Sequence, residues 1–221
     1  MLSLVPDQLG SVVALGAHCD DIAIGAGGTL LAACAASPGL KVTALVLSGG
    51  GTKREEEERA ALAAFCPGAE LDVEVLDLPD GRIPAHWDRA KEALESLSRK
   101  VSPDVVIGPA KHDAHQDHRA LARLVPSAFR DQLVLGYEIV KWDSDMAQPV
   151  AFVPLAAGTA LRKVELLDAC YPSQRARDWF DAETFLGLAR MRGVQCRSRY
   201  AEAFFVDKVV LGVSTTAGGM G

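Results

Sequence analysis

Histidine and aspartate gather in two short segments of this chain. Residues 18–21 read HCDD, and residues 112–118 read HDAHQDH, which holds three of the five histidines. Imidazole nitrogens and carboxylate oxygens together suit a borderline cation such as zinc, which in catalytic sites takes three protein ligands and leaves a fourth position for water. The two segments therefore predict metal-assisted hydrolysis, provided that the fold brings them to one place.

The spacing within each segment is compatible with a shared site. His18 and Asp21 are three residues apart, and His115 and His118 repeat that interval. Side chains three residues apart lie on the same side of a helical turn, so each pair can face one cation. Either segment alone is weak evidence for a metal site, because an aspartate often caps a helix and a lone histidine is often a core residue. Two such segments indicate a site more strongly than either does alone.

Predicted strands precede both segments. SVVALGA at residues 11–17 leads into the first segment, and DVVIG at residues 104–108 leads into the second. Short apolar runs of this kind are typical of buried strands. In open α/β sheets, ligands bind outside the carboxyl ends of the strands. Both segments therefore fall at the sheet edge where a site is expected.

Strands and helices alternate along the first two thirds of the chain, and the last third is less regular. Further strands are predicted at residues 41–47, 71–76, 133–138, 150–154 and 200–210, and helices at residues 29–36, 53–65, 85–100, 117–130, 161–169 and 182–191. The alternation predicts a Rossmann-like α/β fold, with a mostly parallel sheet, helices on both faces and the metal site at the carboxyl ends of the strands. We expect a single domain over residues 1–221, with a tail from about residue 212 that frays.

Charge and cysteine content limit the remaining classes of protein. The chain has 221 residues, 49% of them hydrophobic, and a formal net charge of −6. That acidity argues against nucleic acid or an anionic membrane as a partner, and no apolar stretch approaches the ~20 residues that span a bilayer. The five cysteines have no CxxC spacing, which predicts reduced thiols, and the N-terminus lacks the basic start of a signal peptide. We therefore expect a cytoplasmic protein.

Three segments resemble a known family. AHCDDIAIGAGG at residues 17–28, HQDH at residues 115–118 and YAEAF at residues 200–204 are similar to the motifs AHxDDxxxGxGG, HxDH and YAEAF of the LmbE/PIG-L family of zinc-dependent N-acetyl-sugar deacetylases. The resemblance spans nearly the whole chain, and its two histidine motifs are specific. It implies a hydrolase that removes an N-acyl group, in particular acetyl, from an amino sugar or a sugar-containing metabolite.

The resemblance also implies which residues hold the metal. His18, Asp21 and His118 match the metal ligands of the family. Zinc is the implied ion, and iron(II) suits the same donor atoms. Asp20 matches the general base that activates water, and its position beside a ligand agrees with that role.

Four further residues match positions around the reacting amide. His115 matches the residue that stabilises the tetrahedral intermediate and protonates the leaving amine, and Asp117 matches the carboxylate that orients His115. An aspartate behind a histidine favours its protonated form. Arg54, three residues before Glu57, and Asp80, within LPDG, match substrate-holding positions more loosely.

Two positions depart from the family pattern, and a third histidine stands apart from it. Cys19 stands where the family has proline, and Ala23 where it often has glutamate. A free cysteine is usually buried and inert unless its surroundings are electropositive. The loss of the glutamate bears on the substrate more than on the metal. His112 is expected to lie outside the ligand set, and Tyr137 and Trp142 to belong either to the core or to a sugar-binding face.

Other functions stay open at this point. The same metal site can serve an amidase of a thiol or antibiotic conjugate, or belong to a relative that binds its ligand without catalysis. A nucleotide-binding protein is the alternative from another class, but GAGG at residues 25–28 is not GxGxxG and is more typical of close helix packing. The expected partner is a small N-acylated, sugar-like molecule, and the apolar run at residues 151–155 leaves a homo-oligomer open.

Overall fold

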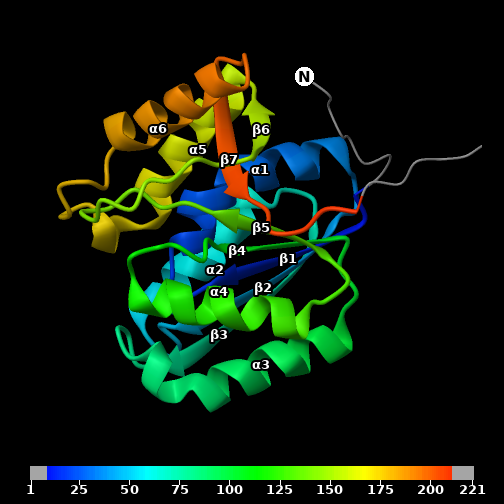
Figure 1. Ribbon diagram of the computed structural model, residues 1–221. Coiled ribbons are helices and arrows are strands. Elements are labelled where there is room, and N and C mark those ends of the chain that lie inside the picture. The colour runs from blue at the N-terminus through cyan, green and yellow to red at the C-terminus, as the bar shows by residue number, and fades with distance from the viewer. Residues whose placement is uncertain (1–8, 211–221) are drawn as a thin grey trace, which may run out of the picture.

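Within residues 9–210, seven strands form one mixed sheet in the order β3-β2-β1-β4-β5-β7-β6 (Figure 1). The computed structural model describes residues 9–210. Its strands are β1 (Ser11–Gly16), β2 (Lys41–Ser48), β3 (Glu70–Leu78), β4 (Val105–Pro109), β5 (Leu133–Tyr137), β6 (Ala151–Leu155) and β7 (Tyr200–Phe205). Its helices are α1 (Asp21–Ala36), α2 (Lys53–Phe65), α3 (Trp87–Lys100), α4 (Gln116–Ala128), α5 (Ala157–Cys170) and α6 (Ala182–Gln195), with short 3₁₀ turns at Ile83–His86 and Pro172–Gln174.

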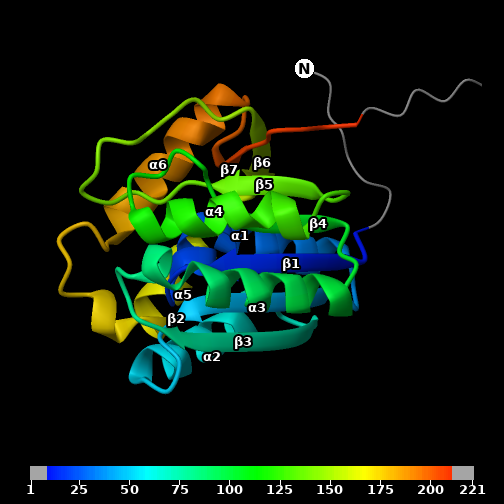
Figure 2. The same ribbon diagram turned by 60° about the horizontal axis from the view of Figure 1, so that its bottom comes forward.

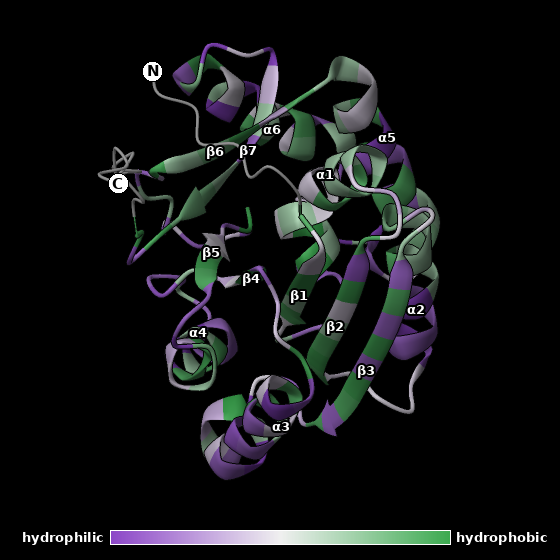
Figure 3. Ribbon diagram, turned by 90° about the vertical axis from the view of Figure 1, so that its right-hand side faces the viewer, coloured by the Kyte–Doolittle hydropathy of each residue, from purple (hydrophilic) through white to green (hydrophobic). Residues whose placement is uncertain are grey.

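The sheet is parallel from β3 to β5, and only β7 runs antiparallel to its two neighbours. Helices α3 and α4 cover one face, while α1, α2, α5 and α6 lie on the other (Figures 2 and 3). Each layer has its own hydrophobic core against the sheet. The expected Rossmann-like α/β fold with a mostly parallel sheet is confirmed.

Burial along the strands follows from this layering. In β1, every residue from Val12 to Gly16 is buried, because helices cover both sides of that strand. Strand β3 lies at an edge of the sheet and alternates polar and apolar residues, as the bands in Figure 3 show. Full burial of a leucine such as Leu15 or Leu45 stabilises the fold by about 1.5–3 kcal/mol, so the central strands are fixed firmly enough to position side chains at their ends.

Helix α1 begins at Asp21, well before the predicted start at residue 29. Gly25, Gly27 and Gly28, which precede the predicted start, lie inside the helix. A Cβ atom added to Gly25 would come within 2.4 Å of the Tyr137 ring, and one added to Gly27 within 2.6 Å of Phe65. These glycines therefore allow α1 to lie unusually close to its neighbours, which outweighs their poor helix propensity.

A buried ion pair ties the last strand to the middle of α1. Glu202 on β7 lies 2.6 Å from Lys163 on α5. Its carboxylate also accepts hydrogen bonds from the backbone N–H groups of Gly28 and Thr29, at 2.8 and 2.6 Å. Lys163 in turn donates to the carbonyl oxygen of Ile24. The YAEAF segment thus has a structural partner in the N-terminal helix.

The strand order reverses between β1 and β4, which are neighbours in the sheet although residues 17–104 separate them in sequence. In open α/β sheets, a crevice forms at such a reversal, outside the carboxyl ends of the strands. The two histidine segments leave β1 and β4 at this point. Among the described residues, no helix is long and apolar enough to cross a membrane. The tail expected to fray from about residue 212 lies outside the described part of the chain.

Candidate active site

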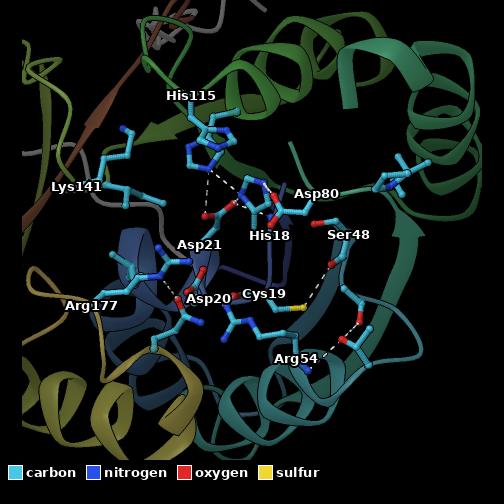
Figure 4. A pocket seen from close by; sticks show the side chains of 18 of the residues that line it. His18, Cys19, Asp20, Asp21, Ser48, Arg54, Asp80, His115, Lys141 and Arg177 are labelled. Carbon is cyan, nitrogen blue, oxygen red and sulfur yellow. Dashed lines mark hydrogen bonds and ion pairs between the residues drawn. The ribbon is translucent and has the colours of Figure 1, made fainter. Parts of the chain in front are cut away.

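A pocket of about 560 Å³ opens at the carboxyl ends of β1 and β4 (Figure 4). It brings together segments that are far apart in sequence, from His18 after β1 to Trp179 in the connection between α5 and α6. Seven residues that we selected from the sequence line it: His18, Asp20, Asp21, Arg54, Asp80, His115 and His118. The eighth, Asp117, is fully buried behind the wall and contacts His18.

The three expected metal ligands converge at one end of this pocket. His18 Nδ1 lies 3.1 Å from His118 Nε2, while Asp21 Oδ2 lies 3.5 Å from the His18 nitrogen and Asp21 Oδ1 lies 3.3 Å from the His118 nitrogen. Four ligands placed tetrahedrally around zinc at 2.0–2.1 Å are separated by about 3.3 Å. The separations of 3.1–3.5 Å among these nitrogen and oxygen atoms are therefore compatible with a zinc ion held by the two rings and the Asp21 carboxylate.

Two other groupings of donor atoms also occur here. Ring nitrogens of His18, His115 and His118 lie within 4.8 Å of one another, as do donor atoms of His18, Asp80 and Asp117. Asp21 is the better third ligand, because its Oδ2 already accepts from the backbone N–H groups of Ala17 and His18 at 2.9 and 2.8 Å. These bonds fix the carboxylate with Oδ1 turned toward His118.

Each candidate histidine ligand has a buried carboxylate at its other ring nitrogen. His18 Nε2 lies 3.1 Å from Asp117, and His118 Nδ1 lies 2.8 Å from Asp113. Carboxylates in this position fix the tautomer and orientation of metal-binding histidines. For His118, burial lowers the pKa and the Asp21 carboxylate raises it by more, to about 9, so metal binding here competes with protons.

The position of Asp117 corrects one expectation. We expected its carboxylate to orient His115, but it lies against His18 and accepts from the backbone N–H groups of Gly81 and Ile83 at 2.7 and 3.0 Å. Only its backbone N–H reaches His115, where it donates to Nδ1 at 3.3 Å. The cause is the helix start: His115 is the N-cap of α4, so its ring accepts from the first turn rather than from a side chain.

Asp113 was missed in the sequence, although it lies inside the HDAHQDH motif. Its side chain is buried between His118 and Lys141, whose ammonium is 3.0 Å away. Lys141 is held on its other side by Asp145 at 2.8 Å. Asp113 could have been selected from the sequence because it lies five residues before the candidate ligand His118, and a carboxylate commonly supports a metal-binding histidine.

Replacing Asp113 with alanine should weaken zinc binding by about 10–100-fold, because His118 loses the group that orients its ring. The dissociation constant for zinc, measured by competition with a chelating dye, checks this. Asp145→Ala is the matched control, since it removes the other carboxylate on Lys141 without touching His118. Equal affinities of Asp113→Ala and the unmodified protein would show that the contact does not support the metal.

Asp20 has an unusual backbone for a residue other than glycine. It caps α1 with φ at +116°, in the left-handed region, where an aspartate is strained but tolerated. The Glu58 carboxylate, fully buried in α2, accepts from the Asp20 backbone N–H at 2.8 Å and from the Tyr171 hydroxyl at 2.6 Å. Glu58 and Tyr171 thus hold the conformation of Asp20, and no sequence motif pointed to either.

Arg54 lies against Asp20 rather than free in the pocket. Its guanidinium is 2.8 Å from the Asp20 carboxylate and 2.9 Å from that of Glu57, and it also donates to the Cys19 carbonyl. Burial raises the pKa of Asp20 to about 7, although the positive charge of Arg54 opposes that rise. A carboxyl group with a pKa near 7 is suited to proton transfer at neutral pH.

The two remaining selected residues, Asp80 and His115, both line the pocket. Asp80 is largely exposed and lies 3.1 Å from His18 Nε2. Burial and the neighbouring His118 and His18 rings lower the pKa of His115, opposite to the direction that the expected imidazolium requires. With Nδ1 accepting from Asp117, the neutral ring carries its proton on Nε2.

Three residues fall outside the candidate chemistry. His112 packs edge-on against Phe205, with ring centroids 4.2 Å apart, as expected for a residue outside the ligand set. Cys19 is buried, and burial raises the pKa of its thiol, so it remains a protonated packing residue. Tyr137 is fully buried and donates to the Leu15 carbonyl, so it belongs to the core, whereas Trp142 lines the pocket.

Residues 13–129 match the sequence profile of the family described as GlcNAc-PI de-N-acetylase, PIG-L. The chain belongs to the PIG-L family. The matched region runs from β1 through α4 and includes both histidine segments. The family resemblance that the motifs indicated is therefore confirmed, and the fold is of the deacetylase type.

Solved structures similar to this PIG-L protein share its fold. N,N'-diacetylchitobiose deacetylase from Pyrococcus horikoshii is 20% identical, with a TM-score of 0.68 over 90% of this chain and 84% of that one. The conserved protein TT1542 from Thermus thermophilus is 26% identical, with a TM-score of 0.71 over 93% and 98% of the two chains. GalB, the 4-carboxy-2-hydroxymuconate hydratase from Pseudomonas putida, is 19% identical, with a TM-score of 0.73 over 93% and 100%. The fold therefore carries more than one reaction.

Proposed function

We propose that this PIG-L protein is a zinc-dependent hydrolase that removes the N-acetyl group from an amino sugar or a sugar-containing metabolite. The observation that carries this proposal is the convergence of the donor atoms of His18, Asp21 and His118 to within 3.1–3.5 Å of one another, with Asp20 lining the same pocket. The family match and the solved chitobiose deacetylase support amide hydrolysis.

His18, Asp21 and His118 would hold the metal, with Asp117 and Asp113 fixing the two rings. When bound, zinc lowers the pKa of water and polarises a carbonyl group. The chain itself has to orient the amide, remove a proton from water and supply one to the leaving nitrogen. Those tasks fall to residues around the ligands.

We assign Asp20 as the general base. Its carboxylate adjoins a ligand and lines the pocket, and its pKa of about 7 suits a group that takes a proton near neutral pH. Arg54 fixes its orientation through the contact at 2.8 Å. We assign His115 as the group facing the oxyanion, because its Nε2–H can donate into the pocket. That donation stabilises the negative charge that develops on the substrate oxygen. Because His115 Nδ1 accepts from the Asp117 backbone, we assign the proton for the leaving nitrogen to Asp20, which has taken it from water.

The size and lining of the pocket agree with a sugar-like substrate. Small-molecule sites usually measure ~300–1,000 Å³ and combine aromatic faces with a few polar groups. This cavity measures about 560 Å³, and Trp142, 66% exposed, lies in its lining. Asp80, also exposed in the lining, is a candidate for holding sugar hydroxyl groups.

The deciding experiment measures amine release from a panel of N-acetyl amino sugars, free and conjugated, with zinc-loaded protein and with chelator-treated protein. We expect release that disappears with the chelator and returns with zinc. Release only from an acylated thiol or antibiotic conjugate would mean that the proposed substrate class is wrong and that the zinc-dependent mechanism is right. Activity that is indifferent to chelators would contradict the mechanism. Hydration of an unsaturated acid without amine release would favour the reaction named for GalB.

A further inference from the structure

Three cationic side chains line the pocket: Arg54, Lys141 and Arg177. The first two are each paired with two carboxylates described above. Among residues 9–210, no carboxylate lies within ion-pair distance of Arg177, whereas Arg175, on the same segment, is paired with Asp168 at 2.9 Å. Arg177 is thus the pocket cation whose charge the described chain leaves uncompensated.

Arg177 is also held in place. Its Nε donates to the Gln174 side-chain oxygen at 2.8 Å, and its guanidinium lies over the Trp142 ring, 5.6 Å from the centroid. Gln174 is buried, and its amide donates to Ser173, which also bonds the Glu57 carboxylate. A side chain fixed in this way loses little conformational entropy when it binds a ligand.

The bond from Nε determines which part of the guanidinium can bind a ligand. Arginine presents its five N–H groups as a planar fork, and the two terminal nitrogens can bind two oxygens of one carboxylate or phosphate. Because Nε donates to Gln174, the two terminal nitrogens of Arg177 are the ones that remain available to bind a ligand. Figure 4 shows Arg177 on the same side of the pocket as Lys141 and across from Asp80.

The charges around the pocket are mostly negative, so they would not attract anionic substrates in general. The chain has a net charge of −6, and Asp77, Asp80 and Asp143 also line the pocket. An acidic surface of this kind repels anions at long range. A single fixed arginine within it selects an anionic group at one position, next to Trp142, which is 66% exposed and is an aromatic side chain of the kind that packs against sugar rings.

We propose that Arg177 forms an anion subsite, and that the substrate is an N-acylated amino sugar carrying a phosphate or carboxylate away from its acylated nitrogen. This proposal rests on the proposed function and narrows its substrate class. Both anions share the pair of oxygens that the guanidinium recognises. Lysine cannot replace arginine here, because an ammonium group lacks the fork.

The test compares kcat/KM for N-acetylglucosamine, its 1-phosphate, its 6-phosphate and N-acetylmuramic acid, whose lactyl group supplies a carboxylate. We expect one anionic substrate to exceed the neutral sugar by about tenfold or more, as charge-assisted hydrogen bonds typically give. Arg177→Gln should remove that preference, so that kcat/KM values for the anionic and the neutral sugars lie within about twofold of each other. Arg177→Lys should recover little of it, and Arg175→Gln is the matched control.

A binding measurement separates this proposal from the proposed function. Glucosamine and glucosamine 1-phosphate and 6-phosphate are titrated calorimetrically into the zinc-loaded protein and the Arg177→Gln variant. Tighter binding of a phosphorylated sugar that is lost in the variant supports the subsite even if no panel member is hydrolysed. Equal binding of phosphorylated and neutral sugars, or a preference that survives in Arg177→Gln because the phosphate contacts the metal, overturns it. So does hydrolysis without preference for an anion.

Discussion

Replacing Asp20 with asparagine should lower kcat for amide hydrolysis by about 10²–10⁴-fold and leave the zinc content unchanged. Asparagine has the same shape and tolerates the left-handed backbone at this position, whereas alanine would add strain. Asparagine cannot take a proton from water, although its side-chain oxygen can still accept from Arg54 after the ion pair at 2.8 Å is lost. The hydrogen bond from the Asp20 backbone to Glu58 does not involve the replaced group and should persist.

The measurement combines steady-state kinetics with metal analysis of the same sample. Asp143→Asn is the matched control, because Asp143 also lines the pocket but lies outside the contacts of Asp20 and the candidate ligands. It should keep kcat within about twofold. An Asp20→Asn protein that retains full turnover would show that another group removes the proton.

Replacing His118 with alanine should remove both the metal and the activity. His118 Nε2 is one of three converging donor atoms, and two ligands are too few for a stable catalytic zinc site. The fold should survive, because the Asp113 carboxylate that loses the ring keeps Lys141 as a partner at 3.0 Å. We expect zinc to fall from about one ion per chain to near none, with the circular dichroism spectrum unchanged.

His112→Ala is the control for that variant. His112 belongs to the same seven-residue segment, yet its ring lies against Phe205 outside the pocket lining. It should bind zinc like the unmodified protein. A His118→Ala protein with a full zinc content would mean that one of the other groupings, such as the one with His115, holds the metal.

The sequence was sufficient to place the two histidine segments together. Both follow apolar strands, and the carboxyl ends of parallel neighbours meet at one edge of the sheet, so motif and topology reinforce each other. The boundaries of α1 were harder, since glycines that disfavour a helix locally are required by its contacts with Tyr137 and Phe65. The partner of Asp117 depended on the geometry of a helix cap, which residue spacing does not specify.

Residues from the last third of the chain could not be predicted as part of the site. Tyr171 supports Asp20 through Glu58, and Gln174 and Arg177 reach the pocket from the connection between α5 and α6. That connection follows no strand and carries no motif. Its position depends on how α5 packs against α1 and α2, which is a tertiary contact rather than a local pattern.

The contact between Glu202 and α1 has a consequence for the order in which the protein matures. Every candidate metal ligand and its supporting carboxylate has been synthesised once residue 118 is joined to the chain. The helix that begins at Asp21 nevertheless receives two of its hydrogen-bond acceptors and its buried lysine contact from residues 163 and 202. A nascent chain, or a fragment limited to the matched residues 13–129, therefore contains the candidate ligands but lacks the contacts of Lys163 and Glu202 with α1. We therefore expect the site to reach its final geometry only after β7 has paired and Glu202 has reached α1.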